Sequence, residues 1–329
     1  MSVRVTADDV ARAAGVSRAM VSRAFTPGAS VSAKKREHVL AVAQALGYRP
    51  NLIARGLTGR STGLIAVVAG EISRPYEAWL LEHLVFELSS RGYQPLLLPA
   101  LRGGNVTEMI DHALAYQVEG AIVAAGSVSR EIADRCRASG APLVLIGRVL
   151  ESSGVDAVCC DNIKGMQLLV NRLVQQGRRR IAWLGGTEDT FSDQERRRGV
   201  EQALSHHGLA LLAVHRGDFS LHSGLNEGLA LLDAGQALDA IICANDAMAL
   251  GVIEAAAQRG IQVPDEIAVT GFDDVPSAAW GRCPLTTVRN PVQETALEAL
   301  RLLEARVQMP TRATQIVRVG VTLVERVSA

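Results

Sequence analysis

The sequence predicts an α/β protein in which a small helical domain precedes a larger body of doubly wound parallel sheets. Three observations support this fold class. Residues 1–60 read as short amphipathic helices and hold ten Lys/Arg against three Asp/Glu, a net charge of +7 in a chain of 329 residues whose total charge is zero. From residue 63 onward, unbroken apolar runs alternate with amphipathic segments. Hydrophobic residues make up 48% of the chain, enough for a large core divided over two or three units.

The stretch from Thr6 to Phe25 predicts two short helices joined by a tight turn. Thr6 can cap the first helix, with Asp9 three residues later in the capping-box position. Gly15 supplies the positive φ that a sharp helix end requires, and Ser17 can cap the second helix. Small residues where the helices cross and a three-residue turn are typical of a helix-turn-helix.

A third amphipathic helix is predicted from Ser32 to Leu46, with its apolar residues facing inward: Val39, Val42, Ala43 and Leu46. Its first turn carries Lys-Lys-Arg at 34–36, which opposes the helix dipole, so these cations fit better facing phosphate. Arg18 and Arg23 lie on the free face of the second helix, which would enter a DNA major groove. A plain helical hairpin in a globular core is the alternative, and it leaves these cations unexplained.

Residues 51–61 are predicted to form a hinge between a domain at 1–50 and the body at 62–329. Asn51 can cap the short segment LIARGLTG, in which Gly56 costs ~1 kcal/mol of helix propensity relative to alanine. We expect so short a segment to be helical only when something holds it.

The body contains seven apolar runs that indicate strands buried on both faces of parallel sheets. These runs are 64–69, 95–100, 120–125, 142–147, 181–186, 239–245 and 266–272. Amphipathic segments that predict helices lie between them, at roughly 76–91, 105–117, 129–139, 163–176, 193–207, 222–234 and 247–259. Right-handed crossovers make this a doubly wound architecture. A single sheet is possible, but two sheets of half the size fit the length better.

Polar residues follow several of the predicted strands, which is where ligands bind in doubly wound sheets. They are Ser73 to Tyr76, Arg148, Asn245-Asp246 and Phe272-Asp273-Asp274. Each taken alone could equally be a helix cap or a turn residue. Together they predict a site for a small polyhydroxy ligand.

Other classes of protein find little support in the sequence. The five cysteines form no C-x-x-C pair, and the spacing of the histidines matches no metal-ligand motif, so we expect no metal site and no disulfide framework. No phosphate-binding glycine loop or nucleophile elbow follows a strand, so neither an enzyme nor a bound cofactor is expected. The apolar runs are too short to span a bilayer, and no signal peptide is recognisable, which predicts a cytoplasmic protein without membrane attachment.

The chain resembles the lactose-repressor (LacI/GalR) family of bacterial transcription regulators over essentially its whole length. The resemblance is carried by four segments: VTADDVARAAGVSRAMVSRAF, VSAKKREHVLAVAQALGYRPN, CANDAMALGVIEAAAQRGIQVPDEIAVTGFDD and PLTTVRNP. It implies a body like the periplasmic sugar-binding proteins, with one subdomain at 62–160 plus 290–320 and another at 161–289 plus 321–329. It also implies a repressor whose affinity for operator DNA changes when a sugar or sugar acid binds in the cleft between the subdomains.

Two alternatives to an inducible repressor remain open. One is a purine-type regulator, whose ligand acts as a corepressor. The other is a transport-type solute-binding protein, which would share the fold of the body but would need a secretion signal and would carry no basic helix-turn-helix. The sequence has no leucine heptad tail before Ala329, so we expect a homodimer that reads a near-palindromic operator.

The resemblance also assigns site residues. It gives Arg18, Ala19 and Arg23 as the residues that read bases, and an arginine can grip guanine in a bidentate fork. The expected phosphate contacts are Thr6, Ser17, Ser22 and Ser32. Leu57 matches the leucine that wedges into the minor groove and kinks the DNA.

For the effector, the resemblance assigns six residues: Tyr76, Arg148, Arg196, Phe219, Asn245 and Asp273. Arg196 lies in the run ERRRG, so Arg197 and Arg198 remain alternatives for its role. Arg148 stands where several relatives present an acid. A second cation near Arg196 favours a ligand with a carboxylate or a phosphate, unless Arg148 pairs with a nearby acid.

Overall fold

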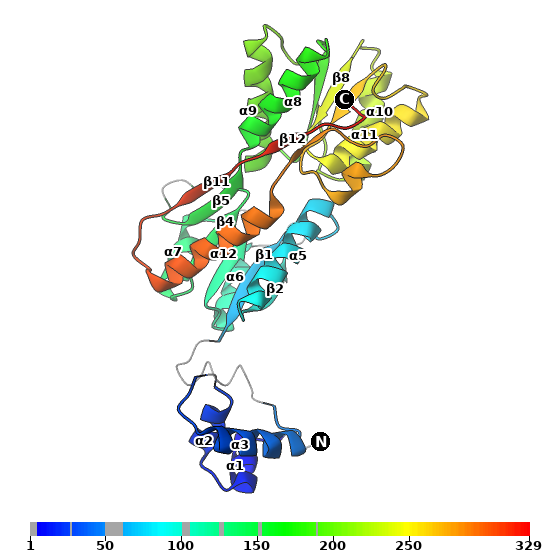
Figure 1. Cartoon of the computed structure of the whole chain (residues 1–329). Helices are drawn as coiled ribbons and strands as arrows, with labels where there is room; N and C mark the ends of the chain where they lie inside the picture. Colours follow the sequence, from blue (N-terminus) through cyan, green and yellow to red (C-terminus); the bar gives the residue numbers. More distant parts are fainter. Residues whose placement is uncertain are drawn as a thin grey trace. The chain divides into compact units, whose positions relative to one another are not determined.

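The computed structural model describes residues 5–26, 28–49, 62–100, 106–124, 128–150, 153–188 and 190–329. The chain divides into two compact units, Met1–Thr62 and Gly63–Ala329 (Figure 1). The predicted hinge and its Leu57 lie outside the described residues.

The first unit holds α1 (Ala7–Ala14), α2 (Arg18–Ala24) and α3 (Ala33–Ala45) around one small core. Thr6 and Asp9 form the predicted capping box, and Gly15 ends α1 with a φ of 63°. The core residues are Val10, Ala11, Ala14, Val21, Ala24, Val39 and Ala43. The predicted helix-turn-helix and third helix are therefore confirmed.

One residue of the predicted core is placed wrongly. Leu46 is 39% exposed, because α3 ends at Ala45 and Leu46 occupies the C-cap position. Tyr48 packs against this core instead, and its ring meets that of Phe25 edge to face, with 5.7 Å between the centroids.

The first sheet of the second unit has six parallel strands in the order β11-β5-β4-β3-β1-β2. Its strands are β1 (Leu64–Ala69), β2 (Gln94–Pro99), β3 (Gly120–Val123), β4 (Leu143–Ile146), β5 (Asp156–Cys160) and β11 (Ile316–Val319). One face is covered by α5 (Pro75–Ser90) and α12 (Val292–Gln308), and the other by α6 (Val106–Ala115) and α7 (Arg130–Ala138). The sheet therefore has the two helical layers that its apolar strands require.

The second sheet has four parallel strands in the order β7-β6-β8-β9. They are β6 (Ile181–Gly185), β7 (Ala213–Arg216), β8 (Ala240–Cys243) and β9 (Ala268–Thr270). Its helices are α8 (Asn162–Gln175), α9 (Phe191–His206), α10 (Leu221–Asp233) and α11 (Asp246–Gln258). A short 3₁₀ turn, η1 (Pro276–Ala279), follows β9, and β10 (Thr287–Arg289) pairs antiparallel with β12 (Thr322–Val324).

The chain runs between the two sheets at several points (Figure 1). β5 of the first sheet leads into α8, which contacts α9, and β11 leads into β12. In the other direction, β10 leads into α12, whose buried residues pack against the first sheet. These connections place the carboxyl end of β5 and the start of α8 between the sheets.

The seven predicted strands and seven predicted helices are all present, and the prediction of two sheets is confirmed. The expectation that each apolar run is buried on both faces is wrong for β2, which is partly exposed because it lies at the sheet edge. The apolar-run criterion also missed β5 and β7, which read DAVCC and AVHR; polar residues at one end of each strand, Asp156 in β5 and His215-Arg216 in β7, leave the apolar run short.

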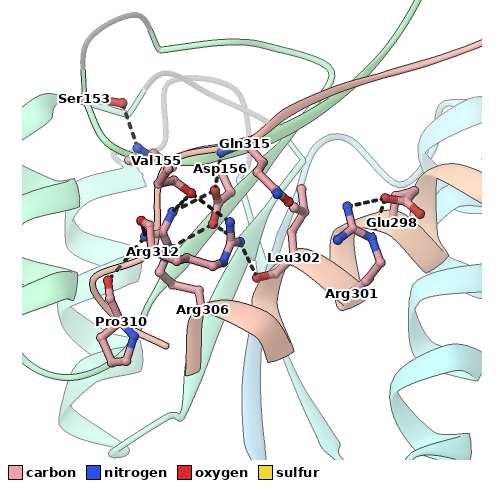
Figure 2. Close-up of polar contacts among 11 residues, drawn as sticks. Ser153, Val155, Asp156, Glu298, Arg301, Leu302, Arg306, Pro310, Arg312 and Gln315 are labelled. Carbon is pink, nitrogen blue, oxygen red and sulfur yellow. Dashed lines mark hydrogen bonds and ion pairs between the residues drawn. The ribbon is translucent and has the colours of Figure 1, made fainter. Parts of the chain in front are cut away.

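A buried carboxylate joins three segments of the first sheet that are distant in sequence (Figure 2). Asp156 on β5 is fully buried and accepts hydrogen bonds from Arg306 Nη2 at 2.9 Å, Arg312 Nη2 at 2.6 Å and the Gln315 backbone N–H at 2.8 Å. Arg306 lies in the last turn of α12, and Arg312 and Gln315 precede β11. Two guanidinium groups thus neutralise one carboxylate and hold β11 beside β5.

Candidate DNA-binding surface and ligand cavity

The outward face of α2 carries the residues predicted to read bases. Arg18, Ala19 and Arg23 are exposed, as is Ser22, while Val21 and Ala24 on the opposite face are buried. This alternation follows from the 3.6-residue period of the helix. The structure therefore gathers these four residues on one free surface of the first unit.

Only weak contacts hold the two arginines. Arg18 lies 3.8 Å from Asp8, and both side chains are well exposed, so the pair contributes little in water. Arg23 Nε donates to the Ala19 carbonyl at 3.3 Å. Both guanidinium groups can therefore reorient toward a base edge at small cost.

The four predicted phosphate contacts differ in their surroundings. The Thr6 hydroxyl donates to Asp9 at 2.7 Å, and the two hydrogen bonds from Thr6 lower the pKa of Asp9. The Ser17 hydroxyl accepts from the Met20 N–H at 3.2 Å, which leaves its own proton free to donate. Ser32 caps α3 without a side-chain hydrogen bond, and Ser22 is exposed. Thr6 is thus the one of the four whose hydroxyl proton is already engaged.

The expectation that residues 34–36 all face phosphate is wrong for Arg36. Its guanidinium donates to the carbonyls of Ala24 at 2.7 Å, Thr26 at 3.1 Å and Ala29 at 3.0 Å. These carbonyls lie at the end of α2 and just after it, where a helix leaves acceptors without intrahelical partners. Arg36 therefore fixes the loop between α2 and α3, while Lys34 and Lys35 remain exposed.

The body encloses a cavity of ≈ 200 Å³ between its two sheets. The first sheet contributes residues at the carboxyl ends of β1, β4 and β5 and at the start of α5; the second contributes α9 and the residues after β8 and β9. All six predicted effector residues line it: Tyr76, Arg148, Arg196, Phe219, Asn245 and Asp273. The cavity lies where ligands bind in doubly wound sheets.

Arg196 is the charged centre of the second-sheet side. It is 5% exposed, its Nη2 lies 3.2 Å from Asp273 Oδ1, and its Nη1 and Nε donate to the Ala244 carbonyl and to Asn162 Oδ1. Its guanidinium carbon lies 3.8 Å from the centroid of the Phe272 ring. Each of the three guanidinium nitrogens thus has a hydrogen-bond partner and one face packs on Phe272, which accounts for the burial of the side chain.

Burial and pairing act in opposite directions on this pair of charges. Burial disfavours the charged guanidinium, but Asp273 and the neighbouring groups outweigh it and raise the pKa of Arg196. Burial raises the pKa of Asp273 in spite of the opposing effect of Arg196. The other two arginines of the ERRRG run lie elsewhere: Arg197 pairs with Glu201 at 2.8 Å, and Arg198 is exposed. Of the three, Arg196 lines the cavity.

Phe219 and Asn245 are positioned by each other. Phe219 has a φ of 67°, and its ring covers Gly186 so closely that a Cβ there would lie 2.1 Å from it. Asn245 caps α11 by accepting from the Met248 N–H and donates from Nδ2 to the Phe219 carbonyl at 3.0 Å. The helix-cap interpretation of Asn245 and its place in the cavity are therefore both correct.

Several residues of the cavity wall were not predicted from the sequence. These are Glu77, Cys160, Asn162, Asn290 and Thr295, among others. Burial, and next the charge of Asp273, raise the pKa of Glu77 to about 7. Asn290 lies in the PLTTVRNP segment, but nothing in its local sequence indicates a cavity. Among the described residues, no three His, Cys, Asp or Glu side chains gather closely enough to hold a metal ion.

A helix-turn-helix unit followed by a two-sheet body with a polar cavity defines a DNA-binding regulator that responds to a small molecule. Comparison with known proteins agrees. Residues 6–51 match the model of bacterial regulatory proteins of the lacI family, and residues 170–329 match a periplasmic binding protein-like domain. Within the described residues, no helix has the length and apolar character needed to cross a membrane.

Two curated relatives span nearly the whole chain. Catabolite control protein A of Priestia megaterium is 30% identical over 96% of each chain, and the HTH-type transcriptional regulator CelR of Thermobifida fusca is 33% identical over 92% of each. The chain belongs to the lacI family of bacterial regulatory proteins, and it is a transcriptional regulator.

Two solved structures share its fold. The lac repressor dimer bound to operator and the anti-inducer ONPF superimposes with a TM-score of 0.89 at 27% identity, covering 99% of each chain. A complex of the transcriptional regulator CelR with cellobiose gives a TM-score of 0.75 at 31% identity, covering 99% of this chain and 100% of that one. The predicted α/β fold class, with a helix-turn-helix domain and a body of the periplasmic-binding type, is confirmed.

Proposed function

We propose that the protein is a cytoplasmic, homodimeric repressor, with no catalytic activity, that releases a near-palindromic operator when a sugar or sugar acid binds in its cavity. The observation that carries this proposal is the cavity itself, in which all six predicted effector residues converge from both sheets. The relatives support it, since a solved lac repressor is a dimer bound to operator and CelR has been solved with cellobiose.

At the operator, the exposed face of α2 supplies the sequence readout. Arg18 and Arg23 grip guanine edges, and Ala19 offers a methyl contact. Ser17, Ser22 and Ser32 donate to phosphates, which fix the register without reading sequence. Thr6 joins them when its hydroxyl leaves Asp9. Leu57 inserts into the minor groove at the centre of the operator and kinks it.

The effector acts through allosteric linkage. It reduces operator affinity only if it binds the DNA-free state more tightly than the bound state. The halves of the body that carry the two sheets, 62–160 with 290–320 and 161–289 with 321–329, change their angle when the ligand binds. This change separates the hinges, residues 51–61, of the two subunits. A coupling free energy of ~1–3 kcal/mol between the two binding sites is typical of allosteric proteins.

The test begins with selection of duplexes from a random-sequence pool by the purified full-length protein. Recovery of a two-fold symmetric sequence is expected, with an affinity for it that falls when an effector sugar is added. Equal affinity for all duplexes, with and without sugars, would overturn the proposal. An affinity that rises with the ligand would overturn the inducer part of it.

A further inference from the structure

We propose that the effector is an anionic carbohydrate, and that Arg148 binds its carboxylate or phosphate group. This inference rests on the proposed function, because it takes the cavity between the sheets as the effector site. It narrows the ligand from sugars in general to sugars that carry a negative charge.

The charge of the cavity wall favours an anionic ligand. Three arginines line the cavity, at 74, 148 and 196, against two acidic residues, Glu77 and Asp273. Arg196 and Asp273 neutralise each other, at 3.2 Å. The pKa of Glu77 is raised to about 7, so near neutral pH this carboxyl group carries only part of a charge. Arg74 pairs with Glu71 at 3.4 Å, so the excess of positive charge on the first-sheet side lies at Arg148.

Arg148 lacks an acidic partner. It follows β4, is half-buried, and forms no ion pair with any acidic group in the part of the chain that the structure describes. Its Nε is buried and has no hydrogen-bond partner there. Burial lowers its pKa, and no carboxylate opposes that effect. Since an unpaired buried charge is costly, a ligand that supplies an anion at this point gains the pairing that the protein leaves unmade.

Two buried polar groups of the cavity favour a ligand with hydroxyl groups. Asn290 Nδ2 donates to Asp273 at 3.1 Å, which orients Asn290 Oδ1 as an acceptor, and this buried oxygen has no partner among the described residues. The buried Thr295 hydroxyl likewise has no hydrogen-bond partner among the described residues. Asn290 Oδ1 needs a hydrogen-bond donor, which an anion without O–H groups, such as sulfate, does not supply and a sugar hydroxyl does.

These requirements select the class of ligand together. A neutral sugar satisfies Asn290 and Thr295 but leaves Arg148 without a counter-charge. A simple anion pairs with Arg148 but leaves Asn290 Oδ1 unsatisfied. A sugar acid or a sugar phosphate meets both demands.

The experiment compares matched ligands on the full-length protein by thermal shift and calorimetry. Each neutral sugar is paired with its acid and its phosphate, for example glucose, gluconate, glucuronate and glucose 6-phosphate, over a panel of hexose and pentose series. We expect one acidic sugar to bind at least about tenfold tighter than its neutral parent, the gain of a charge-assisted hydrogen bond. The carboxylate and phosphate arms decide which anionic group the site takes.

Two controls test the role of Arg148. Arg148→Gln should remove the preference, so that this variant binds the acid no more tightly than the neutral parent, and Arg148→Lys should retain part of the preference. Arg197→Gln, which alters an arginine that pairs with Glu201 outside the cavity, should leave the preference unchanged. Raising the salt concentration should weaken the wild-type protein's binding of the acid alone, which requires no variant.

The outcomes separate this inference from the proposed function. If no acidic sugar raises the melting temperature, or if Arg148→Gln binds acid and parent as the wild type does, the inference is overturned. A neutral sugar that releases the operator would leave the proposed function standing in that case. If the protein without any sugar shows no preference for one duplex sequence, the proposed function is overturned, whichever sugar binds.

Discussion

Replacement of Arg196 by methionine tests the buried pair at the centre of the cavity. Arg196→Met keeps the length of the side chain but leaves Asp273 buried with Asn290 as its remaining partner. It also removes the donors to Asn162 Oδ1 and to the Ala244 carbonyl. Breaking a buried ion pair from one side costs about 3–5 kcal/mol of unfolding free energy. We therefore expect this variant to lose its effector response partly through destabilisation of the second sheet.

The double variant Arg196→Met/Asp273→Asn tests whether the lost stability comes from the unpaired charge of Asp273. With both charges removed, it should recover about 1–3 kcal/mol relative to the single change. Amide hydrogen exchange of Ile181–Gly185, the central strand β6, measures the local stability without assuming that the whole chain unfolds in one step. Arg197→Met is the control, since its exposed pair with Glu201 should cost less than about 1 kcal/mol.

The pH dependence of the single variant gives a further check. Burial already raises the pKa of Asp273, and loss of Arg196 raises it further, so the folded variant binds a proton that the unfolded chain releases. Stability from such a group is present at low pH and is lost as the pH rises through its folded pKa. The deficit should therefore be larger at pH 8 than at pH 6. A loss below about 1 kcal/mol at both pH values would refute the argument that this pair is energetically coupled.

Three other predictions concern separate parts of the molecule. Arg23→Ala should lower affinity for the selected operator by about 10–100-fold and for random DNA by much less; equal losses in a binding titration would reduce Arg23 to a phosphate contact. Asp156→Ala should lower the free energy of urea unfolding by about 3–5 kcal/mol, because it leaves Arg306 and Arg312 without their carboxylate partner. Glu298→Ala is the control: it breaks the exposed pair with Arg301 (Figure 2) and should lower this free energy by less than about 1 kcal/mol. Glu77 has a pKa of about 7, so its ionisation between pH 6 and pH 8 should lower the affinity for an acidic sugar. Calorimetry on Glu77→Gln should show no such fall in affinity. If the pH profile of this variant matched that of the wild type, Glu77 would not be the group that sets it.

The parts of the fold that the sequence predicted depend on short-range physics. The capping box of Thr6 and Asp9, the positive φ of Gly15 and the buried face of α2 each involve residues within four positions of one another. The apolar runs likewise report burial directly, since a strand covered on both faces has no polar side. These features need no knowledge of what the chain packs against.

The features that the sequence did not predict depend on distant partners. Arg36 has the composition of a phosphate-binding residue, and only the position of the carbonyls after α2 shows that it closes a loop. Asp156 meets Arg306 and Arg312, which are more than 140 residues away, at a depth that only the packing of α12 and β11 creates. No periodicity records such a contact.

The residues that line the cavity include some that the sequence predicted and some that it did not. The position of residues after buried strands predicted Arg148, Asn245 and Asp273, because the carboxyl ends of parallel strands meet at one edge. Asn290 and Thr295 were missed because they enter from β10 and α12, after the chain has already crossed between the sheets.

The distribution of polar groups over the two sheets explains why a ligand can act as a switch here. A ligand shifts a conformational equilibrium only by the difference in its affinity for the two states. Arg196 and Asp273 belong to the second sheet and already satisfy each other, whereas Arg148 belongs to the first sheet and has no acidic partner in the described chain. An anionic sugar paired with Arg148 also faces Phe219 and Asn245, which line the cavity from the second half, and therefore contacts both halves at once.

The protein itself also joins the two halves beside the cavity. Glu195, the neighbour of Arg196 on α9, accepts two hydrogen bonds from Arg318 on β11, at 2.6 and 2.7 Å, and a third from Asn162. Because Asn162 also accepts from Arg196, a ligand that moves Arg196 alters the same set of contacts that ties α9 to the first sheet. Effector binding can therefore weaken or strengthen the Glu195–Arg318 contact between the halves, and the angle between the halves then depends on whether the ligand is bound.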